Sequence, residues 1–297
     1  MTRHTTFALF GNAYQQAKSA AIQQVLQCLQ AHGATIRIEE EYHRFLLTTG
    51  LIDSRHDMET FCGPDFEADF ALSMGGDGTL LKTASQVRDR QIPIVGINMG
   101  RLGFLADVGA DDVESTIDAL CRGDYAVEQR SLIHVEFSPG GAKAIDGYDC
   151  ALNDVAILKR DTASMISIRA SINGEHLTTY QADGLIVSTP TGSTAYSLSN
   201  GGPIIVPRTG VLLLTAVAPH SLNVRPIVIP DTAEIELTVG SRSHTFLVAI
   251  DGRSHKLPEG TTLRLSRAPY TVQLVKRSGS RYFSTLREKM MWGADVR

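Results

Sequence analysis

The sequence predicts an α/β protein with an N-terminal parallel α/β domain and a mainly β, sandwich-like C-terminal domain. Over the first hundred residues, short apolar runs alternate with stretches of helical periodicity, which is the pattern of strand-helix-strand units. From about Val127 onward, strand-like runs follow one another with turn signals between them, which favours sheet packed on sheet. We place the domains at residues 1–126 and 127–276, with the segment 277–297 as a candidate to return to the first domain.

The N-terminal domain is Rossmann-like in its alternation of strands and helices. A first unit is predicted from a strand at 7–10, a helix at 17–31 and a strand at 34–38. A second comprises a strand at 68–74, a glycine turn, a helix to about Val87 and a strand at 92–97. Such units form parallel sheets with right-handed crossovers. One more helix is expected at 113–121.

The C-terminal domain is predicted from its succession of short apolar runs. Asn173-Gly174 between two such runs is a strong hairpin signal. Strands are expected at 133–137, 155–158, 166–172, 176–180, a run ending at Ser188, 227–229, 234–239, 245–250, 263–265 and 271–275. The last stretch, 283–292, has a helical pattern.

The composition describes an ordered globular protein without a general affinity for polyanions. Its 297 residues are 43% hydrophobic and 20% charged, the mean hydropathy is −0.03 and the net charge is −4. We therefore expect neither nucleic acid nor a membrane as a partner. The four cysteines form no C-x-x-C pair, so we expect reduced thiols and no zinc site. No signal peptide and no apolar run long enough to cross a bilayer is visible, and we expect a cytoplasmic protein.

The glycine turn Gly75-Gly76-Asp77-Gly78-Thr79 follows an apolar strand and opens a helix. Amides at a helix N-terminus favour an anion, and glycines let phosphate oxygens approach the backbone. An Asp in such a turn would repel the anion unless a metal or a reacting hydroxyl lies between them. Asp77 is therefore a candidate acid/base or metal-organising group.

The alternative is that the glycine turn is only a turn, because Gly and Asp are common turn formers. The chain has no Gly-Lys-Ser or Gly-Lys-Thr and no G-x-G-x-x-G spacing at this point. These absences disfavour the interpretation of the glycine turn as a P-loop or as an ordinary dinucleotide-binding fingerprint.

A second constellation follows the strand that ends at Ser188. Residues 189–199 are rich in hydroxyl side chains and contain Tyr196. They could bind ribose hydroxyls, an amide or a phosphate, with the phenol covering a flat ring. The alternative is a surface loop whose hydroxyls bond their own backbone. A long connection without regular structure is more often functional.

These segments together resemble the NAD kinases over nearly the whole chain. The glycine turn is shared with diacylglycerol and sphingosine kinases, whereas the long hydroxyl-rich segment is specific to NAD kinases. The resemblance rests on 75–79, Asn153-Asp154, Asp183-Gly184, 189–199 and 201–204, in the order and approximate spacing of that family.

The resemblance implies transfer of the γ-phosphoryl group of ATP to the 2′-hydroxyl of the adenosine ribose of NAD, giving NADP, with a divalent metal such as Mg²⁺. A carboxylate can take the proton of an attacking hydroxyl, and Asp77 matches the general base proposed for the family. Gly75, Gly76, Gly78 and Thr79 match the positions that hold the donor phosphates. We assign no metal-ligating side chain.

The resemblance also implies a set of NAD contacts. Asn153 and Asp154 match a paired polar contact, although an Asn-Asp pair is otherwise a common turn. Ser164 and Gln181 fall where family members vary. The full set is Asp77, Gly78, Lys82, Asn153, Asp154, Ser164, Gln181, Asp183, Thr194, Ala195, Tyr196, Ser197, Leu198, Ser199 and Arg253.

The sequence departs from the family pattern at one of these positions. Where many members have Asp-Gly-Gln, this chain has Asp251-Gly252-Arg253, so the expected NAD contact of Arg253 comes from a different residue type than in those members. Two residues before Asp183, members of the polyphosphate-using type have Gly, whereas those of the ATP-only type have a bulkier or polar residue. Gln181 resembles the second type, so we expect a preference for ATP.

The resemblance further implies a homodimer or homotetramer, with sites at the junction of the domains and possible completion by a neighbouring subunit. Two rivals are a lipid or other small-molecule kinase with the same glycine turn and a non-catalytic NAD-binding regulator. No metal-binding spacing connects His176, His220, His244 and His255, and they receive no role.

Overall fold

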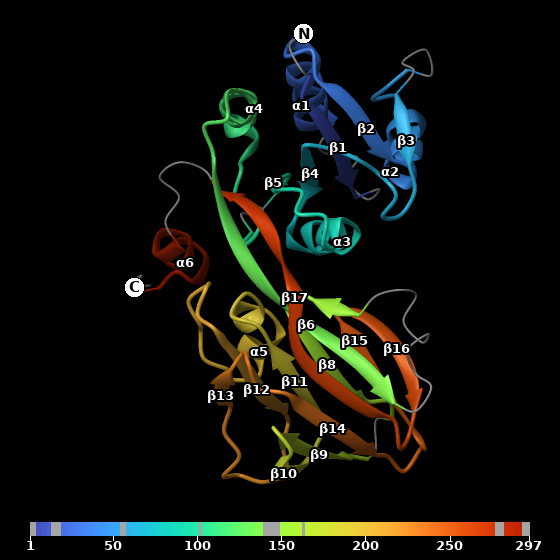
Figure 1. Ribbon diagram of the computed structural model, residues 1–297, viewed down its shortest axis with the longest axis vertical. Coiled ribbons are helices and arrows are strands. Elements are labelled where there is room, and N and C mark those ends of the chain that lie inside the picture. The colour runs from blue at the N-terminus through green and yellow to red at the C-terminus, as the bar shows by residue number, and fades with distance from the viewer. Residues whose placement is uncertain are drawn as a thin grey trace. The chain divides into compact units, whose positions relative to one another are not determined.

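The computed structural model describes residues 4–12, 19–53, 58–100, 103–138, 149–161, 164–276 and 282–292. The chain divides into two compact units (Figure 1). The N-terminal unit comprises Met1–Gln129 and Val272–Arg297, and the β unit comprises Arg130–Thr271. The C-terminal segment is thus counted with the N-terminal unit.

The N-terminal unit is built on a parallel sheet with the strand order β3-β2-β1-β4-β5. The strand order reverses between β1 and β4, and in open α/β sheets ligands bind beyond the carboxyl ends of the strands at such a point. The glycine turn follows the carboxyl end of β4. The strands are β1 (Thr6–Gly11), β2 (Thr35–Glu39), β3 (Glu59–Phe61), β4 (Phe70–Gly75) and β5 (Ile94–Asn98).

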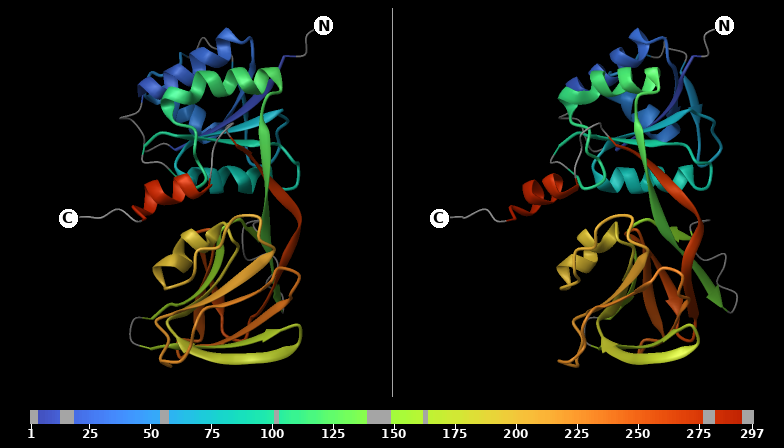
Figure 2. Two further views of the ribbon diagram at one scale, coloured as in Figure 1. Left: turned by 90° about the vertical axis from the view of Figure 1, so that its left-hand side faces the viewer. Right: turned by 60° about the vertical axis from the view of Figure 1, so that its left-hand side comes forward.

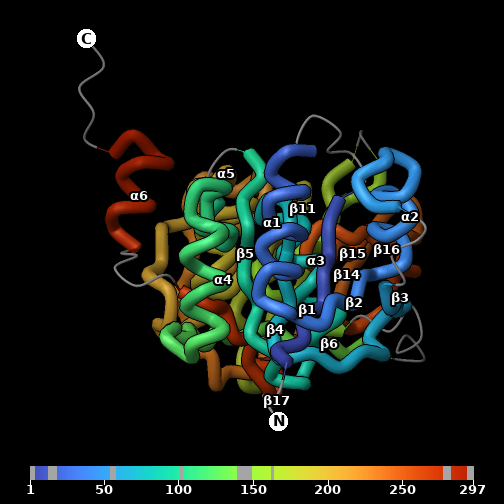
Figure 3. The backbone as a smooth tube through the Cα atoms, turned by 90° about the horizontal axis from the view of Figure 1, so that it is seen from above, coloured from blue at the N-terminus to red at the C-terminus, as the bar shows by residue number. Residues whose placement is uncertain are grey.

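Helices cover both faces of this sheet. In Figures 2 and 3, α1 and α4 lie side by side on one face and α3 lies on the opposite face. Strands β4 and β5 are buried throughout, as expected for central strands of a parallel sheet. The helices are α1 (Ser19–Ala31), α2 (Glu40–Thr48), α3 (Asp77–Val87), α4 (Val113–Arg122), preceded by a 3₁₀ turn at Ala110–Asp112, and α6 (Tyr282–Met290).

The β unit consists of two layers of strands with a hydrophobic core between them. One layer has the order β13-β12-β11-β8-β15-β16 and the other contains β10-β9-β14-β17 together with β6 and β7. Buried side chains of both layers, such as Ile157 and Leu185 from one and Ile168 and Leu237 from the other, belong to one core cluster. Alternation of buried and exposed residues along β14 matches this arrangement.

The elements of the β unit have the following bounds. The first layer is β8 (Asp154–Lys159), β11 (Gly184–Ser188), β12 (Val211–Val217), β13 (Ile227–Pro230), β15 (Thr245–Ile250) and β16 (Arg253–Pro258). The second is β6 (Ala126–Ser138), β7 (Cys150–Ala151), β9 (Ile166–Ile172), β10 (Glu175–Ala182), β14 (Ile235–Gly240) and β17 (Thr262–Lys276). The 3₁₀ turn Gly192–Thr194 and α5 (Tyr196–Ser199) lie between β11 and β12.

The predicted fold class is confirmed, and so is the hairpin at Asn173-Gly174, where φ is 51° and 80°. The expected helix at 283–292 is present as α6. The separate strands expected at 263–265 and 271–275 are wrong, because β17 runs without a break through both. Within the described residues, no helix is long and apolar enough to cross a membrane.

Candidate active site

The glycine turn joins the buried strand β4 directly to α3. Gly76 is the N-cap of α3, in an extended conformation, and Asp77 is the first helical residue. A Cβ on Gly75 would lie 2.2 Å from Oγ1 of Thr79, so only glycine fits there. At Gly76 and Gly78, by contrast, a Cβ would meet nothing within 4 Å. Packing among the described residues therefore does not explain these two glycines.

The carboxylate of Asp77 is fixed by three backbone amides. Oδ2 accepts from the N–H of Phe104 at 2.8 Å, and Oδ1 accepts from those of Leu105 and Ala106 at 3.1 Å each. These three donors and the N-terminus of α3 hold the side chain of Asp77 in one orientation. A Cβ on Gly103 would lie 1.9 Å from Oδ1 of Asp77. The segment 103–106 is thus shaped to receive this carboxylate, a contact that sequence reasoning missed.

Two other predicted residues of the N-terminal unit have protein partners. Thr79 is buried against Gly75. The ammonium of Lys82 lies 2.7 Å from Oε2 of Glu41 and 3.7 Å from Oε1 of Glu39. The hydrogen bond from Lys82 is the main reason why the pKa of Glu41 is lowered. The charge of Lys82 is therefore compensated by carboxylates at the start of α2.

Lys289 is a cation near Asp77 that the sequence pattern did not indicate. Its Nζ lies 4.4 Å from the ring centroid of Phe104, within the range of a cation–π contact. Burial lowers the pKa of Lys289, and the charge of Asp77 opposes that change. Helix α6 thus brings a partly desolvated lysine to the segment that holds Asp77.

In the β unit, Asn153 and Asp154 form a turn at the start of β8. This turn, with Leu152, is held by Asp251 from the β15–β16 hairpin. Oδ2 of Asp251 accepts from the N–H of Leu152 at 2.8 Å, and Oδ1 accepts from those of Asn153 and Asp154 at 2.8 and 3.2 Å. Arg253 lies at the start of β16. Burial raises the pKa of Asp251, and the backbone donors and the charge of Arg253 oppose that rise. Asp251 is a second anchor that sequence reasoning did not single out.

The hydroxyl-rich segment docks on the other side of the same turn. The N–H of Thr189 donates to the carbonyl oxygen of Asn153 at 2.9 Å, and Oγ1 of Thr189 donates to that of Leu152 at 2.6 Å. A Cβ on Gly192 would lie 2.0 Å from the carbonyl oxygen of Asn153. The Asn153-Asp154 turn is therefore enclosed between this segment and Asp251.

Several hydroxyls of the segment 189–199 are used inside the protein. Oγ of Ser193 donates to the carbonyl oxygen of Pro190 at 2.7 Å, and Oγ of Ser197 lies 2.9 Å from Oγ1 of Thr215. Both serines are fully buried. The expectation of a long connection without regular structure is wrong, because it contains a 3₁₀ turn and α5. The backbone-bonding alternative thus describes part of the segment.

The remaining predicted residues of this segment are accessible to different degrees. Tyr196, at the start of α5, is 40% exposed. Ser199 is exposed as well, whereas Thr194, Ala195 and Leu198 are half-buried. The phenol of Tyr196 and the hydroxyl of Ser199 are the groups that this segment offers to a ligand most openly.

Burial shifts the pKa of the Asp154 carboxyl group. Desolvation, followed by the nearby charge of Asp251, raises the pKa of Asp154 from 3.8 to about 7. Burial also raises the pKa of Asp251, and its three backbone donors oppose that rise. The two carboxyl groups thus form a coupled acidic pair beside the turn.

Three predicted residues lie at the opposite end of β8. Strand pairing places Asp154 beside Ser188, whereas Gly184 pairs with Leu158 four residues further along β8. Lys159, the last residue of β8, forms an ion pair with Asp183 at 2.7 Å. Five strand residues separate the two ends by about 16 Å. Ser164, Gln181 and Asp183 are therefore not brought together with Asn153 and Asp154 within this chain.

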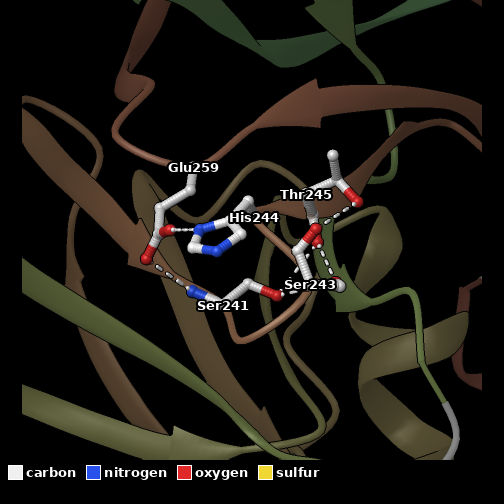
Figure 4. A network of polar contacts seen from close by, with 5 residues as sticks. All are labelled: Ser241, Ser243, His244, Thr245 and Glu259. Atoms are coloured by element: carbon white, nitrogen blue, oxygen red, sulfur yellow. Dashed lines mark hydrogen bonds and ion pairs between the residues drawn. The ribbon is translucent and has the colours of Figure 1, made fainter.

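Ser164 and Gln181 line a cavity of about 580 Å³ at this far end. Gln181 donates to Oγ of Ser167 at 3.0 Å. The cavity is bordered by the loop between β14 and β15 and by Glu259, which follows β16. Glu259 lies 2.7 Å from Nδ1 of His244 and accepts from the N–H of Ser241 at 3.0 Å (Figure 4). The hydrogen bond from His244 is the main reason why the pKa of Glu259 is lowered. His244 thus holds a carboxylate at the cavity rim.

Comparison with known proteins assigns the family. The model of the ATP-NAD kinase N-terminal domain matches residues 7–125, and that of the C-terminal domain matches residues 152–277. An NAD kinase from Bacteroides fragilis is 54% identical over 291 residues, covering 98% of this chain and 99% of the relative. One from Porphyromonas gingivalis is 42% identical over 298 residues, with the same coverage.

Solved structures agree on the fold. Yeast NADH kinase complexed with NADH superimposes with a TM-score of 0.88 at 19% identity, covering 100% of this chain and 90% of that one. An NAD kinase from Archaeoglobus fulgidus in complex with ATP gives 0.73 at 23% identity, covering 96% and 98%. With both domains matched and close relatives aligned along their full length, the chain belongs to the NAD kinase family and is an NAD kinase enzyme.

Proposed function

We propose that the enzyme transfers the γ-phosphoryl group of ATP to the 2′-hydroxyl of the adenosine ribose of NAD, with Asp77 as the general base. The observation that carries the proposal is the carboxylate of Asp77, fixed by three backbone amides beside two glycines that packing does not require. A carboxylate held by three amides is ready to accept a proton at a defined place. Open backbone at a helix N-terminus suits phosphate oxygens.

The chemistry follows from these groups. The ribose oxygen forms a bond to the γ-phosphorus, the bond from that phosphorus to the bridging oxygen of ADP breaks, and the hydroxyl proton passes to Asp77. Gly75, Gly76, Gly78 and Thr79 form the donor-phosphate cradle, in which Gly76 and Gly78 leave the backbone open. Most of the rate then comes from positioning and charge stabilisation rather than covalent chemistry.

A divalent cation fits this arrangement as a companion of ATP. Mg²⁺ commonly binds one or two carboxylates, substrate phosphates and water. Among the described residues, no three His, Cys, Asp or Glu side chains gather into a cage, which is consistent with a metal carried by the donor phosphates. When bound, the metal would neutralise charge that develops on the transferring phosphoryl group.

The β unit is proposed to bind NAD. Asn153 and Asp154 supply polar contacts from a rigid turn, and Tyr196 and Ser199 are the accessible groups of the neighbouring segment. Thr194, Ala195, Ser197, Leu198 and Arg253 of the β unit are also proposed as NAD contacts, and Gly78 and Lys82 of α3 are the proposed contacts from the N-terminal unit. The hydroxyl of Ser197 would contact NAD only after leaving Thr215.

Purified enzyme incubated with NAD, ATP and magnesium is expected to form NADP and ADP in equal amounts. NADP can be quantified by an NADP-specific dehydrogenase assay, and omission of magnesium should abolish the signal. In a parallel reaction, inorganic polyphosphate should support less than a tenth of the ATP rate, because Gln181 replaces the glycine of polyphosphate users. Binding of NAD without NADP formation would instead identify a non-catalytic regulator. Equal rates with the two donors would refute only the donor preference.

We further propose that the far-end residues Ser164, Gln181 and Asp183 of one subunit complete the NAD site of a neighbour in a homodimer or homotetramer. The basis is their separation from Asp154 along β8 by about 16 Å within one chain. Such sharing requires symmetric copies, each giving and receiving the same group.

Co-expression of two impaired variants tests the shared site. Asp77→Asn and Asp183→Asn subunits are each expected to be weak alone, whereas a mixed assembly regains sites in which both residues are native. Random pairing in a dimer restores about a quarter of the wild-type rate per subunit. The variants mixed after purification without subunit exchange serve as control. A co-expressed mixture no more active than its parents would show that each site is confined to one subunit.

A further inference from the structure

The β15–β16 hairpin connects two strands and also holds a segment a hundred residues earlier in the chain. Asp251 and Gly252 at its tip have φ of 47° and 80°, the left-handed pair typical of a tight hairpin turn. This turn directs the carboxylate of Asp251 onto three successive amides, those of Leu152, Asn153 and Asp154. A backbone hydrogen bond also joins the two segments, because the N–H of Asp251 donates to the carbonyl oxygen of Asp154 at 3.0 Å.

These bonds fix the direction of two side chains that the proposed function uses. Oδ1 accepts from both Asn153 and Asp154, so the planes of both peptide groups are set by one oxygen atom. Peptide planes determine where the Cα–Cβ bonds point. On the opposite side, the carbonyl oxygen of Asn153 lies against Gly192 with no room for a Cβ. The turn therefore has little freedom to readjust if the carboxylate is removed.

We propose that Asp251 is a positioning residue for NAD binding, which acts by orienting Asn153 and Asp154 through their backbone amides. This inference rests on the proposed role of the Asn153-Asp154 turn as an NAD contact. A carboxylate suits the task better than an amide because both of its oxygens accept and because hydrogen bonds to a charged acceptor are stronger. An Asn side chain has one acceptor and would turn its NH₂ group toward at least one backbone N–H.

Asp251→Asn is the direct test, because Asn also tolerates a left-handed backbone. Loss of a charge-assisted bond is expected to raise KM for NAD about tenfold, while KM for ATP stays within twofold. The matched control is Asp231→Asn. Asp231 is another buried carboxylate of the β unit, and its ion pair with Arg267 at 3.2 Å does not involve the turn. The control should lower Tm without changing KM for NAD.

The split between the two Michaelis constants separates positioning from mere stability. A purely structural Asp251 would give a lower Tm and a wild-type KM for NAD, and that result would overturn the inference. If Asp251→Asn does not fold, Asp251→Glu keeps the charge with one extra methylene; raised KM for NAD would support positioning, and an unchanged KM would contradict it. An inactive wild type would refute the proposed function itself, whereas an active wild type with an unaffected Asp251→Asn variant would refute only this inference.

Discussion

Asp77→Asn is expected to lower kcat by about 10²- to 10⁴-fold, the usual contribution of a general base. KM for NAD and for ATP should change only a few-fold, because the amide is nearly isosteric and the phosphate cradle stays in place. The reason is chemical: an amide cannot accept the proton of the attacking ribose hydroxyl. Steady-state kinetics with either substrate varied would measure the two parameters separately.

The second task of Asp77 must be separated from the first. Its carboxylate also holds the amides of Phe104, Leu105 and Ala106, so a moved segment could lower the rate without any loss of a base. Asp107→Asn is the matched control. Asp107 is a buried carboxylate just beyond this segment, paired with Lys276 at 2.8 Å, and its loss should lower Tm with kcat within a few-fold of wild type. If Asp77→Asn turns over within tenfold of wild type, Asp77 is not the base.

The strands of the sheets and most helices could be predicted because their signals are local. Alternating or continuous apolar runs gave β1, β4, β5 and β8, and helical periodicity gave α3 and α4. Helix α2 was missed because it starts directly after β2, with no intervening turn residues, and is capped by the carboxylate of Glu39. Strand β16 was missed because only Leu257 of its six residues is buried, so its sequence lacks the apolar pattern of a central strand.

The candidate site could be predicted only as far as its residues form contiguous motifs. The glycine turn and the hydroxyl-rich segment are contiguous and can be recognised in the sequence, and their order matches that of the family. The anchors are not visible in this way. Asp251 reaches an amide 99 residues away, and Asp77 reaches one 27 residues away. A single carboxylate near a turn glycine gives no sign of which distant amides it will meet.

Composition also could not tell which hydroxyls face a ligand. The sequence of residues 189–199 is equally rich in hydroxyls throughout, but Ser193 and Ser197 are buried while Ser199 is exposed. The difference arises from tertiary contacts: Gly202 passes so close to Ser197 that a Cβ would lie 2.2 Å from its Oγ. Which face of such a segment is free is decided by the chain that packs behind it.

For the wild-type enzyme, kcat/KM for NAD is expected to rise with pH and to level off above about 7. Burial and the charge of Asp251 raise the pKa of Asp154 to about 7, and the ionised carboxylate is the form that accepts hydrogen bonds from ribose hydroxyls. Two pH units below that value, only about one molecule in a hundred carries the charge. The rate at pH 5 should therefore be about 100-fold below the plateau.

Asp154→Asn tests whether the rise of kcat/KM below pH 7, the acidic limb of the pH profile, comes from Asp154 or from another titrating group. The variant should have a low kcat/KM for NAD that no longer follows the limb near pH 7, whereas a limb caused by the donor phosphate or by Asp77 would persist. Asp251→Asn should move the limb to lower pH, because the charge of Asp251 is one of the causes that raise the pKa of Asp154. An unchanged limb in Asp154→Asn would assign the titration to another group.

Stability should change in the opposite direction from activity. Because the pKa of Asp154 is higher in the folded than in the unfolded protein, the folded state binds more protons between the two values, and its stability falls as pH rises through that interval. This destabilising contribution of Asp154 is absent below about pH 4, the pKa in the unfolded protein, and complete above about pH 7, the pKa in the folded protein. A rise of about three units corresponds to up to ~4 kcal/mol. Asp154→Asn should consequently unfold at a higher temperature than wild type at pH 8.5, with a much smaller difference at pH 5. A Tm difference independent of pH would mean that the pKa of Asp154 is not raised in the folded protein. The proposed cause of the pH dependence of kcat/KM would then be wrong as well.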